Sequence, residues 1–363
     1  MFKTKSLDWY IVGSLIPILT LSLLTMNSFT GEGNYAERQL VWIAISGSIF
    51  FMCSLIDFRF FRRTSVIVSI YAATIIILLS VFLLGYAAKG AKSWIDLGLF
   101  SVQPADFAKI ALILLLAKYF SRRHVQIAHI RHIIVSGVYA GILFMLVALQ
   151  PDFGSAITIF SIWLGMVLIS GISKKHLMLV FTIGAIAFAG LWNFGFKEYQ
   201  KNRILNFINP LADIRGSGYN AYQAMITVGS GELVGKGIGY GTQSRLKFLP
   251  EYETDFIFAA FAEEWGFIGV IILFILYTIL IARIMIWASR GETNFETLYA
   301  MGLAIFFMVH LTINIGMNIG VMPVTGIPVP FMSYGGSHLL AEFLGLGILM
   351  GMIKYSRATH REV

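Results

Sequence analysis

The chain contains a series of apolar stretches, most of them long enough to cross a lipid bilayer. A helix needs about 20 mostly apolar residues to span the hydrocarbon core. Only 13% of the residues are charged, and the mean hydropathy is +0.78. A soluble domain carries about a quarter charged residues. We therefore predict an all-α, polytopic integral membrane protein, with spans near 8–28, 38–56, 65–86, 132–149, 155–172, 175–195, 255–285, 298–321 and 333–354.

A further stretch, from Pro104 to about Tyr119, is shorter, and by length alone it fits a re-entrant or interfacial segment as well as a span. The positions of the basic residues favour a span, because short cytoplasmic loops are enriched in Lys and Arg. Without this span, the basic stretch that starts at Ser121 would lie on the side of the short, base-poor loops. Ten spans place both termini and every basic cluster on the cytoplasmic side. We predict one domain, residues 1–363, with about ten spans. The basic clusters are Lys3 with Lys5, 59–63, 121–132, 173–175, Arg283 with Arg290, and 354–361.

This topology leaves one long extracytoplasmic segment, residues 197–254, between the seventh and eighth spans. It contains "GSGELVGKGIGYGTQ" (229–243), with five glycines between Gly229 and Gly239. A phosphate-binding loop is one interpretation, but the spacing matches neither a Walker motif nor a dinucleotide fingerprint. The favoured alternative is a turn-rich loop whose backbone packs closely on the membrane surface.

The remaining composition excludes several classes of protein. The net charge of +8 comes from short clusters between apolar runs, which argues against nucleic-acid binding. Cys53 is the only cysteine, so an internal disulfide is impossible. Lys3 and Lys5 precede an apolar stretch without a small-residue cleavage site, so we interpret that stretch as a first span rather than a signal peptide.

Polar residues gather near the predicted outer ends of the spans. Asp106 and Lys109 are three residues apart, so they share a helix face and can form an ion pair. Such a pair is either structural or part of a site. Asp152 follows Pro151 at the next outer turn, where it either caps the following helix or belongs to a site.

The C-terminal third carries a second polar group. His310, Asn314 and Asn318 recur every four residues, a pattern typical of hydrogen bonding between membrane helices. The segment 320–338 follows, with three prolines and four glycines. Irregular backbone at membrane depth is tolerated when it is buried in protein or lines a cavity. We expect its polar side chains, Thr325, Ser333, Tyr334 and Ser337, to face such a cavity, and His338 to pair with Glu342.

The stretch "LPEYETDFIFAAFAEEWGFIG" (249–269) places acids before and inside a predicted span, where a charge is expensive. On an ideal helix Glu263 lies about 80° from Asp255, and Glu264 lies about 180° away. Both cannot join one site. We predict that Glu263 faces the cavity with Asp255 and that Glu264 pairs with another helix.

Several stretches resemble the SEDS family (shape, elongation, division and sporulation). They lie in family order from about residue 89 to 345, and the last two are long and specific. The residues at about 248–269 resemble the elongation branch more than the division branch. The stretches are "QPADFAK", "QPDFGSA", "RILNFINPLADIRGSGYNAYQA", "GSGELVGKGIGYGTQSRLKFLPEYETDFIFAAFAEEWGFIG" and "NIGMNIGVMPVTGIPVPFMSYGGS".

The resemblance implies a peptidoglycan glycosyltransferase that polymerises lipid II on the outer face of the bacterial cytoplasmic (inner) membrane. The family's catalytic aspartate falls on Asp255, which would act as the base in one inverting displacement of undecaprenyl pyrophosphate. The leaving group needs positive charge, for which Arg203, Lys109 and Lys247 are candidates, although contact with lipid headgroups explains each equally well. The other candidate substrate-binding residues are Asp106, Asp152, Glu263, Ser333 and Tyr334.

A divalent cation, Mg²⁺ or Mn²⁺, held by carboxylates and substrate phosphates stays open. No organic cofactor is expected. The resemblance also implies a class B penicillin-binding protein as the transpeptidase partner, with the eighth and ninth spans as contact faces, other elongation-complex proteins, and membrane lipids. Two other functions remain, a lipid II flippase and a non-catalytic scaffold of the elongation complex.

Two residues depart from the family pattern. Ser93 stands where an arginine usually precedes the tryptophan at 94, and Asp106 replaces a glutamate, which shortens the acid by one methylene. The contacts of those side chains must therefore be rebuilt or lost.

Overall fold

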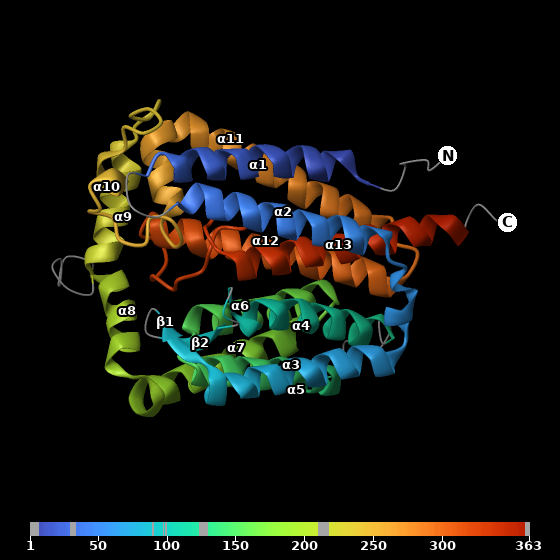
Figure 1. Ribbon diagram of the computed structural model, residues 1–363. Helices are drawn as coiled ribbons and strands as arrows, with labels where there is room; N and C mark the ends of the chain where they lie inside the picture. Colours follow the sequence, from blue (N-terminus) through green and yellow to red (C-terminus); the bar gives the residue numbers. More distant parts are fainter. Residues whose placement is uncertain are drawn as a thin grey trace.

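Nearly all the regular structure is helical, which confirms the predicted all-α membrane fold (Figure 1). The computed structural model describes residues 7–29, 34–88, 91–96, 98, 100–122, 130–209 and 218–359. The long helices are α1 Trp9–Asn27, α2 Tyr35–Leu55, α3 Thr64–Leu84, α4 Pro104–Ser121, α5 Ile130–Leu149, α6 Phe153–Ile169, α7 Lys174–Gly190, α11 Ile257–Ser289, α12 Asn294–Asn318 and α13 Gly336–Thr359.

Within the described ranges, eight helices are long and apolar enough to cross a membrane. The other two are α4, with 18 residues and three charged side chains, and α6, with 17 residues. Both pack among the eight, and α4 is buried along almost its whole length. The stretch from Pro104 that was ambiguous by length is therefore a helix of the bundle. Each predicted span corresponds to one of these helices, with ends shifted by a few residues.

The helices form two groups (Figure 1). One holds α1, α2, α11, α12 and α13, and the other holds α3 to α7. Helix α12 joins the groups, because it packs against α11 on one side and against α4 and α6 on the other. Helix α7, which continues through the π-helical turn η2 (Leu191–Gly195), contains no buried residue. By contrast, buried residues run along almost the whole of α4 and α12, so the core lies along these two helices.

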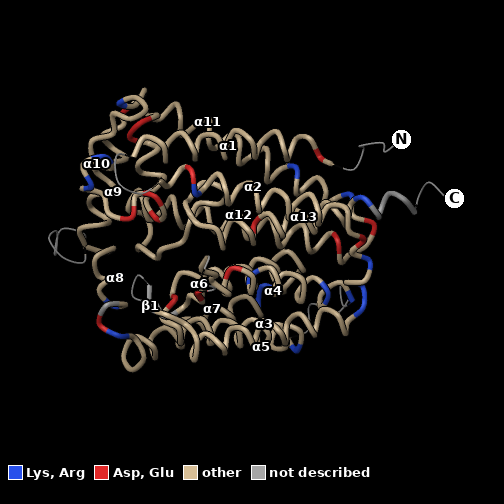
Figure 2. The backbone as a smooth tube through the Cα atoms, in the orientation of Figure 1, with Lys and Arg blue, Asp and Glu red and all other residues tan. Residues whose placement is uncertain are grey.

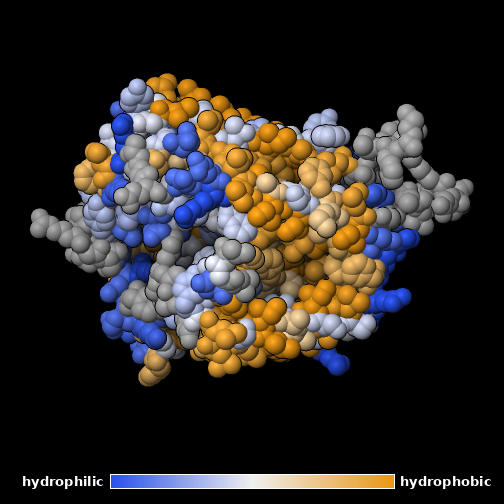
Figure 3. Space-filling view, in the orientation of Figure 1, coloured by the Kyte–Doolittle hydropathy of each residue, from blue (hydrophilic) through white to orange (hydrophobic). Residues whose placement is uncertain are grey.

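Basic residues lie next to the ends of several helices at one end of the bundle. The start of α1, the end of α13 and the described basic residues next to the ends of α2, α4, α6 and α11 lie there, and Figure 2 shows Lys and Arg at this end. The connection after α2 contains the 3-10 turn η1 (Phe58–Arg62). Figure 3 shows an apolar band between two hydrophilic ends. This distribution agrees with the predicted placement of the described basic clusters on one side, while Lys3, Lys5, residues 123–129 and residues 360–363 lie outside the described ranges.

The opposite end carries structure that the sequence reasoning did not resolve. The segment 197–254, predicted only as a long extracytoplasmic loop, contains α8 (Glu198–Ile208), α9 (Tyr219–Ser230) and α10 (Thr242–Arg245). A small antiparallel sheet of β1 (Tyr86–Ala88), β2 (Ala91–Asp96) and β3 (Ser101–Val102) precedes α4. The strands and α10 are too short to produce a clear periodic pattern. Helices α8 and α9 are amphipathic, but they lack the long apolar run that marks a membrane span.

The glycine-rich stretch packs against a break in α11. The helix is interrupted at Gly266, which has φ 65° and ψ −170°. Across the break, Lys236 N donates to Glu263 O at 2.9 Å and Phe267 N donates to Glu232 O at 2.9 Å. The loop thus binds backbone groups that an unbroken helix would pair internally. The glycines serve close packing, as the favoured alternative predicted, but the surface they meet is protein backbone.

Substitution of Gly266 by alanine tests this contact. A Cβ at Gly266 would lie 2.2 Å from Gly235 N, and a φ of 65° with a ψ of −170° is essentially confined to glycine, so another residue costs about 1–3 kcal/mol there. We predict that Gly266→Ala lowers the melting temperature of the purified protein by several degrees. Gly229→Ala is the matched control, because a Cβ there meets nothing within 4 Å. Equal melting temperatures for the two variants would contradict the account.

Candidate active site

Asp255 lies in a turn just before α11, and helix α12 holds the backbone of that turn. Its carbonyl oxygen accepts hydrogen bonds from Asn314 Nδ2 at 3.0 Å and from Asn318 Nδ2 at 3.2 Å. Asn318 Oδ1 accepts a further bond from Ala259 N at 3.2 Å, at the start of α11. Both asparagines are fully buried, whereas Asp255 is partly exposed. The predicted interhelical bonding by the polar stripe is confirmed, and it fixes the candidate catalytic residue.

The irregular segment 319–335 holds the same turn from a second direction. Ser333 Oγ donates to Thr254 O at 2.7 Å, and Tyr334 N donates to Glu253 O at 2.8 Å. Asn314 Nδ2 also donates to Ile327 O at 2.7 Å, which ties the segment to α12. The structure therefore places Ser333 and Tyr334 beside Asp255, but through bonds that position backbone.

The side chain of Asp255 faces a glycine turn of this segment. A Cβ built on Gly326, where φ is +76°, would lie 3.4 Å from Asp255 Oδ2. Next to it, a Cβ on Gly154 in the first turn of α6 would lie 2.5 Å from Thr325 O. The start of α6 and the Asp255 carboxylate thus meet at one turn, and larger residues at either glycine would push them apart.

Asp152 caps α6 and also joins it to α4. Its Oδ1 accepts from Ser155 N at 3.0 Å, which confirms the predicted cap, and its Oδ2 accepts from Gln103 Nε2 at 2.5 Å. Gln103 N in turn donates to Ser337 Oγ at 2.9 Å, at the start of α13. Gln103 was missed by the sequence reasoning. Its position directly before the Pro104 helix start, in the quoted "QPADFAK" stretch, was the available signal.

Asp106 and Lys109 form the predicted ion pair, with Oδ1 and Nζ 3.0 Å apart. Their exposed fractions are 3% and 1%, so the pair lies inside the bundle. The shorter acid at 106 therefore still reaches its lysine. Ser93, the other departure from the family pattern, is buried on β2. Lys109 is thus engaged by Asp106, which supports the structural interpretation of this pair.

The two acids inside α11 bind the glycine-rich loop. Glu263 is fully buried, and its Oε1 accepts from Lys236 Nζ at 2.7 Å and from Thr242 N at 3.0 Å. The prediction that Glu263 faces a cavity with Asp255 is therefore corrected. An ideal-helix projection takes no account of a loop that covers this face. Glu264 Oε1 accepts from Ser28 Oγ at 2.5 Å, at the end of α1, which confirms its pairing with another helix.

Two cationic candidates lie on the outer elements. Arg203 is on α8 and lines a small pocket with residues 320 and 322–324. Lys247 is exposed in the turn after α10, with φ +58°. Among the described residues, no three His, Cys, Asp or Glu side chains gather as metal ligands. The side chains at this end therefore do not form an all-protein cage for a divalent cation.

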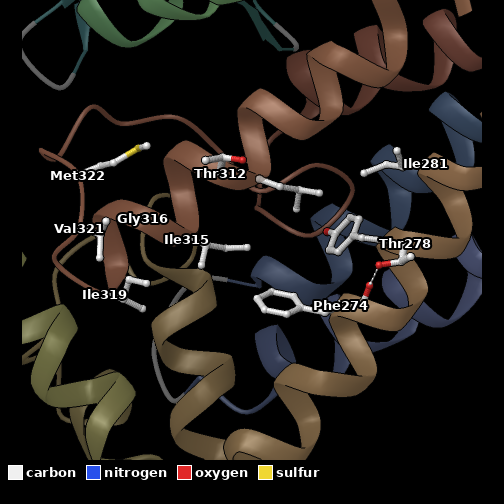
Figure 4. A pocket seen from close by; sticks show the side chains of 11 residues that line it. Phe274, Thr278, Ile281, Thr312, Ile315, Gly316, Ile319, Val321 and Met322 are labelled. Atoms are coloured by element: carbon white, nitrogen blue, oxygen red, sulfur yellow. Dashed lines mark hydrogen bonds between the residues drawn. The ribbon is translucent and has the colours of Figure 1, made fainter. Parts of the chain in front are cut away.

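A separate apolar groove of about 420 Å³ opens between α11 and α12, on the predicted eighth and ninth spans (Figure 4). Phe274 and Thr278 from α11 face Thr312 and Ile315 from α12 across it. Its lining is almost entirely apolar, so it suits a hydrophobic occupant rather than a polar substrate.

Comparison with known proteins identifies the family. Residues 5–358 match the FTSW_RODA_SPOVE family, described as a cell cycle protein. The chain belongs to this family. It is 37% identical to the peptidoglycan glycosyltransferase MrdB of Escherichia coli (strain K12), over 96% of this chain and 92% of that protein. It is 33% identical to stage V sporulation protein E of Bacillus subtilis (strain 168), over 98% and 99% of the two chains.

Solved structures agree with the family assignment. The rod shape determining protein RodA of Thermus thermophilus superposes with a TM-score of 0.72 and 26% identity, over 96% of this chain and 97% of that one. A chain from a peptidoglycan synthase complex, described as coordinating polymerization and crosslinking, gives a TM-score of 0.83 and 28% identity, over 96% and 98%.

The buried ion pair gives a stability prediction. Removing one partner of such a pair leaves an uncompensated buried charge, which costs about 3–5 kcal/mol. We predict a large fall in the melting temperature for Asp106→Ala, and recovery of most of it when Lys109→Met is added. If the double variant melts no higher than the single variant, the pair is not the source of the loss.

Proposed function

We propose that this chain is a peptidoglycan glycosyltransferase of the elongation branch that polymerises lipid II, with Asp255 as its general base. The observation that carries the proposal is the clamp on the Asp255 turn. Its backbone is held by Asn314 and Asn318, while Ser333 holds the preceding residue. The side chain is left partly exposed at the outer end of the bundle. Relatives with the name peptidoglycan glycosyltransferase support the reaction class.

The chemistry requires one carboxylate. Asp255 removes the proton from the 4-hydroxyl of the acceptor sugar as that oxygen attacks the anomeric carbon of the donor. A new carbon–oxygen bond forms while the bond to the lipid pyrophosphate breaks, and the pyrophosphate leaves with the electron pair. The donor is α-linked and the product glycan is β-linked, so a single inverting displacement accounts for the stereochemistry. A pyrophosphate is a good leaving group, so no second acid is needed.

The departing pyrophosphate needs positive charge around it. Among the long described helices, α2, α4, α6, α11 and α13 begin at this end of the bundle, and helix N-termini favour anions. Arg203 and Lys247 are on elements of the same end. We further propose that a divalent cation, if used, takes most of its ligands from the phosphates, because the described side chains supply few. Loss of polymerisation on chelation, restored by Mg²⁺ or Mn²⁺, tests this.

The direction of the protein in the membrane follows from charge. The described basic connections, the start of α1 and the end of α13 lie at the end opposite the start of α11, which comes just after Asp255. Under the positive-inside rule that end is cytoplasmic, so the site faces the outside of the bacterial cytoplasmic membrane. Lipid-linked substrate and growing glycan would meet there.

Substitution of Asp255 tests the base assignment. Asn keeps the size of the side chain and removes its basicity, and the clamp uses only the backbone oxygen of this residue. We predict that purified Asp255→Asn protein is folded and binds lipid II but forms polymer at least about 100-fold more slowly, the usual scale of base catalysis. The measurement is glycan length and yield from lipid II in detergent.

The same assay separates the competing functions. A flippase produces no polymer in detergent, where no second compartment exists, and a scaffold produces none with either protein. Polymer formation by the parent protein therefore excludes both. Normal polymer formation by Asp255→Asn would falsify the role of Asp255 while leaving the glycosyltransferase activity intact.

A partner is the second part of the proposal. We propose that the groove between α11 and α12 receives the membrane helix of a class B penicillin-binding protein, which supplies transpeptidation. The groove is apolar, about 420 Å³ in volume, and open along two spans. The related chain in a complex that coordinates polymerization and crosslinking supports such a pairing. Other elongation-complex proteins and membrane lipids complete the proposed surroundings.

Filling the groove tests this contact. Thr312 is exposed in the groove, and Thr312→Trp is expected to reduce co-purification of the transpeptidase at least about tenfold, because the bulky ring occupies the space for the partner helix. Val68→Trp on α3 is the matched control, since Val68 is also exposed on an apolar helix but lies elsewhere. Equal co-purification for both variants would exclude the groove as the contact.

A further inference from the structure

Glu342, in the second turn of α13, is a buried carboxylate that the proposed mechanism does not use. Its side chain has no exposed surface. Oε2 accepts a hydrogen bond from Phe331 N at 2.8 Å, whereas Oε1 has no partner among the described residues. An ionisable group inside a membrane bundle is costly and usually marks a functional requirement. The contact with Phe331 shows which part of the protein depends on this carboxylate.

Phe331 has an unusual backbone. Its φ is +59°, a left-handed conformation that costs about 1–2 kcal/mol for a residue with a side chain. The surroundings hold it there. Its ring is buried against the rings of Phe307 and Phe343, and the preceding carbonyl, Pro330 O, accepts from Tyr277 Oη at 2.5 Å. The Glu342 bond satisfies the amide of this strained residue, so the turn depends on the carboxylate.

The Phe331 turn leads directly to the groups that hold Asp255. Two residues beyond it, Ser333 Oγ accepts from Val329 N at 2.8 Å and donates to Thr254 O at 2.7 Å. Tyr334 N then donates to Glu253 O. A change at Phe331 would therefore move the two residues that immediately precede Asp255.

Electrostatics adds a second connection. The charges of Asp106 and Lys109, on α4, both act on Glu342. Asp106 Oδ2, like Glu342 Oε1, is buried without a partner in the part of the chain that the structure describes. The buried ion pair and Glu342 thus lie on helices that pack against each other, α4 and α13.

We propose that Glu342 is a positioning residue for Asp255, acting through the Phe331 turn and the Ser333 bond to Thr254. The inference rests on the proposed function of Asp255 and adds a residue that never touches substrate. What matters is an acceptor for Phe331 N–H at this depth. An amide at position 342 retains that acceptor, and a hydrocarbon side chain does not.

The test compares Glu342→Leu with Glu342→Gln in the purified full chain, using lipid II in detergent. Small misplacements of a catalytic group cost up to about 100-fold in rate. We expect Glu342→Leu to lower kcat about 10- to 100-fold with KM changed less than about threefold. Glu342→Gln should keep kcat within about threefold of the parent. A merely structural role would not give this rescue by the amide together with a loss confined to kcat.

A double-variant cycle tests the route. Ser333→Ala removes the bond to Thr254, so it should lower kcat to a similar degree, and adding it to Glu342→Leu should produce little further loss because both act on one element. If Glu342→Leu does not fold, Glu342→Asp replaces it, since the shorter acid withdraws the acceptor from Phe331. Additive losses in the cycle would overturn the route through Ser333.

A parallel assay distinguishes a wrong role for Glu342 from a wrong role for Asp255. Asp255→Asn is assayed in parallel. An inactive Asp255→Asn with a fully active, folded Glu342→Leu overturns only the role of Glu342, as does a Glu342→Gln as slow as Glu342→Leu. An active Asp255→Asn overturns the role of Asp255 and with it the basis of the inference.

Discussion

The site depends on one arrangement, the hydrogen-bonded clamp that fixes the backbone just before α11. Asn314 and Asn318 hold the carbonyl of Asp255, while Ser333 holds that of Thr254. The donors are side chains from α12 and from the irregular segment after it, so the turn has a defined place relative to both groups of helices. Because the clamp uses backbone oxygens, it fixes the backbone of Asp255 and itself makes no bond to the carboxylate. The backbone therefore positions the residue while the side-chain carboxylate accepts the proton, as a general base requires.

The glycine-rich loop stabilises the other side of the same helix. It enters the break at Gly266 and pairs with backbone there, while Glu263 accepts bonds from Lys236 and Thr242 of the loop. Glu263 is therefore satisfied by loop donors rather than by lipid or substrate, and Glu264 binds Ser28 at the end of α1. Helix α11 is thus held at its start by α12 and at its break, Gly266, by the loop. Both contacts direct the outer end of α11, and with it the Asp255 turn.

The membrane spans could be predicted from their long apolar runs, whereas the shorter elements between them could not. All ten spans appear as helices, and the Asp106–Lys109 pair, the Asp152 cap and the polar stripe of α12 followed from residue spacing. The small sheet and α10 did not, because too few residues define them, and the amphipathic helices α8 and α9 lack the long apolar run that marks a span. Glu263 was misplaced because a helix projection contains no information on the loop that covers one face. Gln103 was recognisable only from partners distant in sequence, Ser337 among them, and the expected position of Glu342 beside His338 gave no sign that it binds the amide of Phe331.

The central claim is that Asp255 takes the proton from the acceptor sugar. The most direct measurement is a cryo-electron microscopy structure of the inactive Asp255→Asn protein with two lipid II molecules bound. The account predicts the side-chain atoms of residue 255 about 2.6–3.2 Å from the acceptor 4-hydroxyl oxygen, and that oxygen in line with the anomeric carbon of the donor. A 4-hydroxyl that instead lies against another carboxylate, with residue 255 beyond hydrogen-bond reach, would contradict it.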